Sequence, residues 1–262
     1  MISYCICCQR PPMASFLIKD LIKKTTVPYE ILLWMNTDDK DLLDLIGKEK
    51  KAGAPIEIVG STKHSIGMVG YKILFQRAVH DMIVQVEDTV IMVSRRIAEK
   101  AAAAFTKNPK VKQIVADVIQ DKYTTGGRPP MKDYKPLDTT DELYDGPVDG
   151  WFSVYHRSVL PYLMEAPYER VFFLGSWMRA RLSMAGELGV LTTRFKVFNT
   201  AGPAYANFFG TVKDEIKNFQ EAQKPQRARE YENCALSQND ILAMEETCVK
   251  TAKEFDAMDT TF

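Results

Sequence analysis

The sequence contains no apolar run near the roughly 18 residues needed to cross a bilayer. Its histidines are only three, at His64, His80 and His156, and no two have the spacing of a helical zinc motif. Lys plus Arg equal Asp plus Glu at 34 each, so no net charge draws the chain to nucleic acid or a membrane. No charged leader precedes an apolar segment at the N-terminus. We therefore expect a cytoplasmic protein without a signal peptide or a membrane span.

Cysteine is also scarce, and its pattern argues against a disulfide framework. The cysteines number five, an odd count, and Cys5, Cys7 and Cys8 share one short apolar segment where they cannot pair with one another. Their spacing is not CxxC, and no second cluster completes a set of four metal ligands. We expect reduced cysteines buried on a central strand.

What the sequence does have is a regular alternation of apolar runs and helical patterns, with 46% hydrophobic residues over 262 positions. Each of the first four apolar runs is followed by a helix-like segment, which is typical of parallel strands joined by right-handed crossovers. The predicted strands are 2–8, 29–35, 56–59 and 82–86. The predicted helices are 14–24, a segment ending near 51, 66–78, and a segment capped by Ser94 that runs to 105.

The pattern changes after residue 107. Further strands are predicted at 111–119, 151–155 and 190–198, further helices at 158–164 and 172–185, and a long binding loop or lid at 120–147. From 211 the chain is charged and helical, with a break at Pro225. We expect an α/β domain over 1–210, with halves at 1–107 and 108–210, and a helical C-terminal extension over 211–262. The extension could pack on the domain or serve oligomerisation.

Polar residues follow two of the predicted strands directly. The fourth apolar run stops at Glu87 and Asp88, and an unpaired charge at the end of a buried strand costs several kcal/mol. Such a strand end holds something positive, either a hydrated cation or a basic side chain. The second strand ends in Asn36, Asp38 and Asp39. Because ligands of α/β sheets bind at the carboxyl ends of the strands, these positions are the first candidates for a functional site.

Several short motifs occur in a fixed order along the chain. Gln9 and Arg10 follow the first strand, MNTDD ends the second, a segment with Gly67 and Lys72 precedes the fourth, and EDT ends it. GWFSVYHRSVL and YERVFFLGSWMRARLSMAGELG lie downstream. In this order and spacing, about residues 1–210 resemble GT-A glycosyltransferases of the broad family 2 type. The resemblance implies an α/β, Rossmann-like domain with a mostly parallel central sheet flanked by helices.

The resemblance also implies roles for residues. A divalent cation, Mn2+ or Mg2+, would bind Glu87 and Asp88 and offset the charge that grows on the leaving diphosphate. The acceptor would enter between the 120–147 loop and residues 149–169, with Asp149 or Glu169 as the catalytic base. The residues that would hold the nucleotide-sugar donor, a UDP-sugar, are Arg10, Asn36, Asp38, Asp39, Gly67, Lys72 and Glu87.

Some positions depart from the family pattern. Thr89 stands where the pattern has a metal-binding Asp, Leu174 and Gly175 replace an acidic pair that often supplies the base, and Asn199 or a neighbour replaces a late His. Other residues would then have to take these roles. The substitutes are Asp88 for the metal, Asp149, Glu165 or Glu169 for the base, and Lys72, Arg157 or Arg179 for the diphosphate.

Each candidate also has a purely structural interpretation. The carboxylates after the fourth strand could pair with Arg95 or Arg96, and those after the second could cap the following helix. Lys72 could be a solvated lysine. On the acceptor side, Trp151 could be exposed for stacking on a sugar or base. The lysine-rich segment 107–135 could be a solvated loop or could receive an anionic acceptor such as nucleic acid.

Our hypothesis from the sequence is a glycosyltransferase that moves a sugar from a UDP-sugar to a hydroxyl of a glycan or of a hydroxylated nucleobase in DNA. Two alternatives remain open. A nucleotidyltransferase would need a Gly-rich, basic loop after the first strand, and QRPPMAS has two prolines and no glycine. A non-catalytic nucleotide- or glycan-binding protein would explain the missing catalytic groups.

Overall fold

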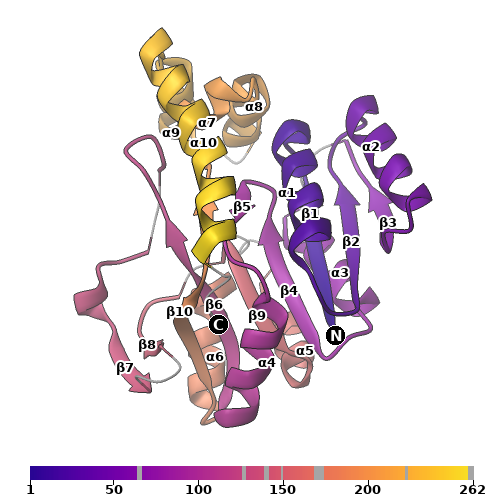
Figure 1. The fold of residues 1–262 in the computed structure, drawn as a ribbon, viewed down its shortest axis with the longest axis vertical. Helices are drawn as coiled ribbons and strands as arrows, with labels where there is room; N and C mark the ends of the chain where they lie inside the picture. The colour runs from indigo at the N-terminus through magenta and orange to yellow at the C-terminus, as the bar shows by residue number, and fades with distance from the viewer. Residues whose placement is uncertain are drawn as a thin grey trace.

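Strands and helices alternate through the first hundred residues of the computed structural model, which describes residues 1–63, 67–125, 128–138, 142–148, 150–167, 174–221 and 224–258 (Figure 1). The strands are β1 (Ile2–Cys8), β2 (Tyr29–Met35), β3 (Ile56–Ser61), β4 (Met82–Glu87) and the short β5 (Val90–Met92). The helices are α1 (Pro11–Lys24), α2 (Lys40–Lys51), α3 (Met68–Arg77) and α4 (Ile97–Lys107). The first four predicted strands are thereby confirmed.

The second half begins with β6 (Val111–Ile119), and its other strands are β7 (Lys135–Asp138), β8 (Leu143–Asp145), β9 (Phe152–His156) and β10 (Leu188–Asn199). Its helices are α5 (Leu160–Glu165) and α6 (Leu174–Met184), with single 3-10 turns at Met131–Asp133 and Arg157–Val159. The chain then continues through α7 (Pro203–Phe208), α8 (Val212–Glu221), α9 (Pro225–Glu232) and α10 (Gln238–Met258). The predicted break at Pro225 is the first residue of α9.

All the described strands join one sheet in the order β3-β2-β1-β4-β9-β6-β10-β8-β7, with β5 paired to β10. The first half is parallel: β1 pairs with β2 and β4, and β2 pairs with β3. Strand β9 then runs antiparallel between β4 and β6, while β10 is parallel to β6. The predicted α/β class is confirmed.

Helices cover both faces of this sheet, which is why its central strands are apolar runs rather than alternating sequences. On β4, Val84 faces the core under α1, α2 and α4, while Ile83 faces the core under α3, α5 and α6. Both side chains are fully buried. Loops lie at the carboxyl edge of the sheet, between these two layers of helices.

Two local predictions are corrected. The 120–147 segment is not only a loop, because β8 pairs antiparallel with β10 and β7 pairs with β8, which extends the sheet. Ser94 does not cap α4: its Oγ accepts from the backbone N of Lys196 on β10 at 2.9 Å. Arg96, in a left-handed conformation, precedes the helix instead. In both cases the local structure is set by contacts with β10, which is distant in sequence.

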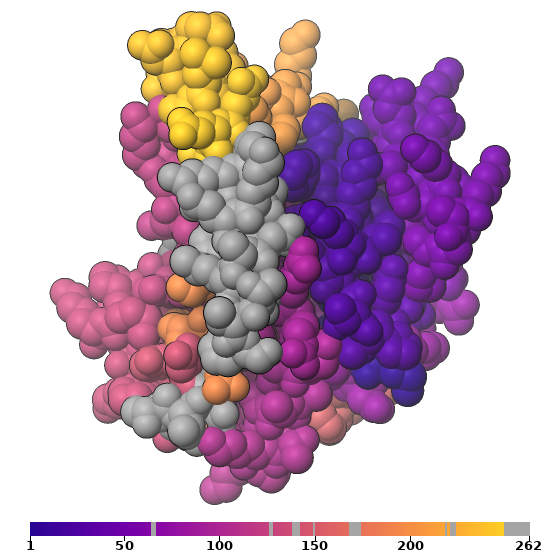
Figure 2. All heavy atoms as spheres, viewed as in Figure 1, coloured from indigo at the N-terminus to yellow at the C-terminus, as the bar shows by residue number. Residues whose placement is uncertain are grey.

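The C-terminal helices stand beyond the carboxyl ends of the first strands (Figure 1), and Figure 2 shows their orange and yellow atoms beside the indigo first half. Met244 and Cys248 of α10 are buried in a cluster with Ile91 of β5 and Tyr205 of α7. Helix α10 therefore packs against its own chain. None of the described helices is long and apolar enough to cross a membrane.

Candidate functional site

Three parallel strands end side by side at the carboxyl edge of the sheet. Cys7 of β1 is in register with Trp34 of β2 and with Glu87 of β4, so the segments after these strands begin at one level. These segments carry most of the predicted donor-binding residues and both predicted metal ligands: Arg10 after β1, Asn36, Asp38 and Asp39 after β2, Glu87 at the end of β4 and Asp88 directly after it.

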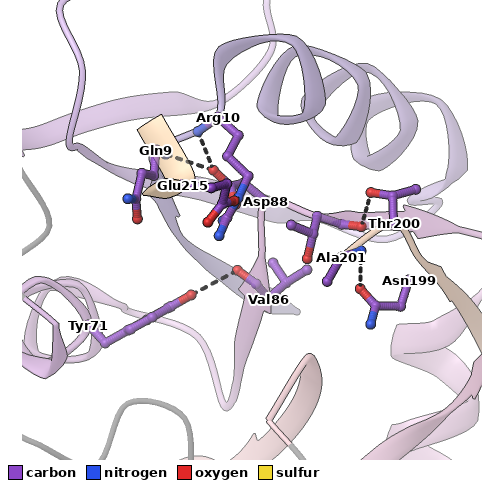
Figure 3. Close-up of polar contacts among 10 residues, drawn as sticks. Gln9, Arg10, Tyr71, Val86, Asp88, Asn199, Thr200, Ala201 and Glu215 are labelled. Atoms are coloured by element: carbon purple, nitrogen blue, oxygen red, sulfur yellow. Dashed lines mark hydrogen bonds and ion pairs between the residues drawn. The ribbon is translucent and has the colours of Figure 1, made fainter. Parts of the chain in front are cut away.

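Asp88 is buried and accepts hydrogen bonds at both oxygens (Figure 3). Its Oδ2 accepts from the backbone N of Gln9 and of Arg10, each at 2.7 Å, and its Oδ1 lies 2.6 Å from Arg10 Nη1. The ion pair expected as a structural alternative thus exists for Asp88, with Arg10 as a partner that was not expected there, while Arg96 pairs with Glu99 at 3.5 Å. The reason is topological, because β1 and β4 are neighbours and the turn after β1 reaches Asp88.

Arg10 also binds a second carboxylate that the sequence did not point to. Its Nε donates to Glu215 of α8, a residue that is only 5% exposed. Burial alone would lower the pKa of Arg10, but Asp88 and Glu215 raise it well above its ordinary value. The guanidinium therefore stays charged. No sequence signal could have found Glu215, since it is an acidic residue in the first turn of a polar helix far along the chain.

Asn36 is oriented by a chain of hydrogen bonds. Trp34 Nε1 donates to Thr62 Oγ1 at 3.3 Å, and Thr62 Oγ1 donates to Asn36 Oδ1 at 3.0 Å. An indole N–H can only donate, so the Thr62 hydroxyl accepts there and its own proton goes to Asn36. The amide oxygen is thereby used. Within the described part of the chain, the Asn36 side chain makes no other hydrogen bond, so its Nδ2 is left as a donor.

The two aspartates after β2 differ in role. Asp39 is the N-cap of α2, and its Oδ1 accepts from the backbone N of Leu42 at 2.8 Å. Asp38 is exposed. The capping interpretation is therefore confirmed for Asp39, and a donor contact stays a prediction for both residues.

Helix α3 presents a tightly packed face to β1 and β2. Gly67 precedes it with a φ of 56°, a conformation that suits glycine. A Cβ on Gly70 would lie 3.1 Å from Cys7 Sγ and 3.1 Å from Trp34 Cδ1, so a larger residue would require these two side chains to shift slightly. Lys72 is 8% exposed, which rules out the solvated interpretation. Tyr71 Oη donates to the carbonyl of Val86 on β4 at 3.1 Å and so ties α3 to the strand that carries the acidic pair.

Glu87 is half-buried on the α3 side of β4, near Tyr71. Burial of Tyr71, together with the nearby Cys7, Glu87 and Asp88, raises the pKa of Tyr71 well above its ordinary value. The backbone N of Glu87 donates to the carbonyl of Trp151 at 3.0 Å. Trp151 is half-buried against the main core, not fully exposed as its stacking role would suggest.

Solved structures are similar to this chain in fold. TarS of S. aureus in complex with UDP is 14% identical with a TM-score of 0.54, over 97% of this chain and 79% of that one. The mannosyltransferase PcManGT from Pyrobaculum calidifontis in complex with GDP-Man and Mn2+ is 10% identical with a TM-score of 0.55, over 99% and 83%. GalNAc-T7 with UDP, GalNAc and Mn2+ is 13% identical with a TM-score of 0.59, over 97% and 58%.

The chain has the GT-A glycosyltransferase fold. By sequence it matches no protein-family model and no curated protein significantly. The likeness is one of backbone architecture, and at these identities the residues of the GT-A site have to be judged from the chain itself.

The residues that a GT-A fold would use for a divalent cation do not fit one here. Asp88 already accepts three hydrogen bonds. Thr89 is a neutral residue whose buried Oγ1 has no partner among the described residues, and Asn199 uses its Oδ1 to accept from the backbone N of Ala201 at 2.9 Å (Figure 3). No group of three His, Cys, Asp or Glu side chains gathers as a metal site in the described ranges. Asp88, one of the two predicted ligands, is thereby excluded.

The predicted catalytic bases, Asp149 and Glu169, lie outside the described residues. Their substitute Glu165 is exposed and pairs with Arg181 at 2.7 Å. Leu174 and Gly175, which replace the acidic pair of the family, are buried at the start of α6.

The two other arginines suggested for the diphosphate have different roles. Arg157 follows the antiparallel β9, so it lies at the amino end of β4 and donates from Nη1 to the carbonyls of Ala78 and His80. The suggestion of a diphosphate role for Arg157 is therefore wrong. Arg179 of α6 pairs with Asp145 of β8 at 2.6 Å.

Proposed function

We propose that this chain is a glycosyltransferase that moves a sugar from a UDP-sugar to a hydroxyl acceptor. The supporting observation is that Arg10 and Asn36 follow adjacent parallel strands at the same edge of a GT-A fold. The half-buried guanidinium of Arg10 suits the diphosphate, because its planar N–H fork matches phosphate oxygens. The donor would thus lie across the carboxyl edge of β2, β1 and β4, where open α/β sheets bind ligands.

Asn36 supports a base that carries a carbonyl group. The Trp34–Thr62 chain uses its amide oxygen, so the side chain offers a hydrogen-bond donor. Uracil presents two carbonyl oxygens to such a donor, so the Asn36 side chain is suited to UDP as the nucleotide part of the donor.

The acceptor would approach over the second half of the sheet. Arg128, from the predicted acceptor segment, lies 2.5 Å from Asp117 of β6, so this part of the segment is held on the sheet. A glycan hydroxyl or a hydroxylated nucleobase in DNA are the acceptors we propose, with Asp149 or Glu169 as base. The divalent cation predicted at Glu87 and Asp88 is not part of the proposal, because Asp88 is held by Arg10 and the backbone.

A non-catalytic nucleotide-binding protein is the second candidate, and the buried Leu174 and Gly175 at the start of α6 favour it. A thermal-shift screen with UDP, GDP and ADP tests the donor site, and we expect UDP to stabilise the protein most. Incubation with UDP-sugars then separates the two candidates. Release of UDP supports the transferase, and stabilisation without UDP release supports the binding protein. Formation of UTP and sugar 1-phosphate from a UDP-sugar and added pyrophosphate would instead indicate a nucleotidyltransferase, and no stabilisation by any nucleotide would contradict the donor site.

A further inference from the structure

The side chain of Arg10 joins two parts of the chain that lie far apart in sequence. Asp88 at the end of β4 binds one side of the guanidinium, and Glu215 of α8 binds the Nε side. Glu215 is a buried anion held against the half-buried cation Arg10, at the strand ends where the proposed donor phosphates would lie (Figure 3).

We propose that Glu215 occupies the position of a donor phosphate on Arg10, that the diphosphate replaces it on binding, and that Arg10 neutralises the diphosphate in place of a divalent cation. This inference rests on the proposed function, because it assigns a residue to the phosphates of the same donor.

The two carboxylates are held very differently. Asp88 accepts from two backbone N–H groups as well as from Arg10, so it is fixed by the turn after β1. Among the described residues, the Glu215 carboxylate has Arg10 Nε as its hydrogen-bond partner. If Glu215 leaves, one charge-assisted hydrogen bond of Arg10 is lost and a phosphate restores it, so the net change in free energy is small. If Asp88 left, three hydrogen bonds would be lost. Asp88 is therefore the anchor, and Glu215 is the exchangeable group.

Charge balance favours the exchange. Besides Asp88 and Glu215, Glu87 also raises the pKa of Arg10, so three carboxylates act on this guanidinium. A diphosphate added to this set would be repelled by these carboxylates in a partly buried setting. Departure of Glu215 removes one negative charge and frees the Nε edge of Arg10. A phosphate can then take a two-bond contact along that edge.

The packing of α8 allows this departure. Its main neighbours in the described part of the chain are α7 and α9, including a contact between the rings of Phe219 and Tyr231 at 5.3 Å. No strand of the sheet is a main neighbour of α8. Helix α8 also begins just after Gly210, which has a φ of 72°. A shift of the first turn of α8 would therefore release Glu215 without disturbing the sheet.

The test is a calorimetric titration of UDP into wild-type protein, Glu215→Gln and Asp214→Asn, each with Mn2+ and with EDTA. Asp214 is the matched control, since it is an exposed acid in the same helical turn and its replacement changes the net charge equally. We expect Glu215→Gln to bind UDP about tenfold more tightly, because its neutral amide competes less well for Arg10. Asp214→Asn should match the wild type, and Mn2+ should change none of the affinities.

Unchanged or weaker UDP binding by Glu215→Gln would overturn the exchange, since Glu215 would then be a structural clamp. If that variant does not fold, Glu215→Asp replaces it: the shorter side chain keeps the charge but loses the reach, and UDP should again bind more tightly. UDP binding that requires Mn2+ would overturn the role of Arg10 while leaving the proposed function intact. Absence of UDP binding by every protein, with and without Mn2+, would overturn the proposed function itself.

Discussion

Asp88 and Asn36 show how much of the site depends on single polar atoms. The sequence predicts that the carboxylates after β4 hold something positive, and for Asp88 that positive group is Arg10. The identity of the partner was not predictable, because the turn geometry that aims Arg10 at Asp88 depends on the pairing of β1 with β4. The contact of Glu215 with Arg10 was even less predictable, because the sequence of a polar helix does not indicate which residues it contacts.

The amide of Asn36 leads to the first prediction. Asn36→Asp replaces the Nδ2 donor with an oxygen, so a base carbonyl would meet a carboxylate instead of an N–H. We expect UDP affinity to fall at least about tenfold, from the loss of one buried hydrogen bond and the added repulsion. Isothermal titration calorimetry measures the UDP affinity of the variant and of the wild type. Asp44→Asn, an exposed change on α2, is the control. Equal UDP affinity for Asn36→Asp and the wild type would remove Asn36 from the site.

Among the elements, α2 offers a test of the cap that the sequence predicts. Asp39→Ala removes the acceptor for the backbone N of Leu42 and should lower the free energy of unfolding by about 1 kcal/mol. Asp38→Ala, at an exposed neighbouring position, should leave it nearly unchanged. Urea denaturation of the two variants measures the difference. A loss of the same size in both would show that Asp39 contributes only through its charge.

The close packing of Trp34 gives a prediction for β3. A Cβ on Gly60 would lie 2.4 Å from Trp34 Cζ3, so Gly60→Ala must displace the indole. We expect it to destabilise the protein by about 1–3 kcal/mol and to weaken UDP binding through Thr62 and Asn36. Gly47→Ala on α2, with open space around the new methyl group, should instead stabilise by about 0.5–1 kcal/mol. Thermal and urea unfolding decide the signs, and stabilisation by Gly60→Ala would contradict the packing.

The elements also show where prediction from sequence stops. Buried parallel strands such as β1 and β2 are predictable, since helices on both faces require continuous apolar runs. Strands β7 and β8 are not, because they are three or four residues long and form only by pairing at a distant sheet edge. Ser94 does not act as a cap for the same reason, because its hydroxyl oxygen accepts a hydrogen bond from the backbone N of Lys196 on β10.

At the scale of the whole molecule, the C-terminal helices contact both the core and the site. Helix α10 adds Met244 and Cys248 to the cluster with Ile91, while α8 brings Glu215 to Arg10. The sequence left open whether the extension packs on the domain or joins oligomers, and α10 packs on the domain. The division into units at residues 210 and 211 stays a prediction.

The cysteines can be used to test the packing of the core. All five are free, and burial raises the pKa of the Cys248 thiol to about 11 and those of Cys5 and Cys8 well above their ordinary value. We expect these three thiols to resist a thiol reagent at pH 8 in the native protein and to react after unfolding, because the thiolate is the reactive form. Cys7 and Cys234 are half-buried, and Cys234→Ser identifies the contribution of Cys234 to the number of labelled thiols. Fast native labelling of Cys5 or Cys8 would contradict the packed core.

The most direct test of the account is amide hydrogen exchange of the wild-type protein with and without UDP. We predict slower exchange in the segments after β1 and β2, around Arg10 and Asn36, and faster exchange in the first turn of α8, around Glu215. Protection confined to other parts of the chain, or no change at saturating UDP, would contradict a nucleotide site at the carboxyl edge of this sheet.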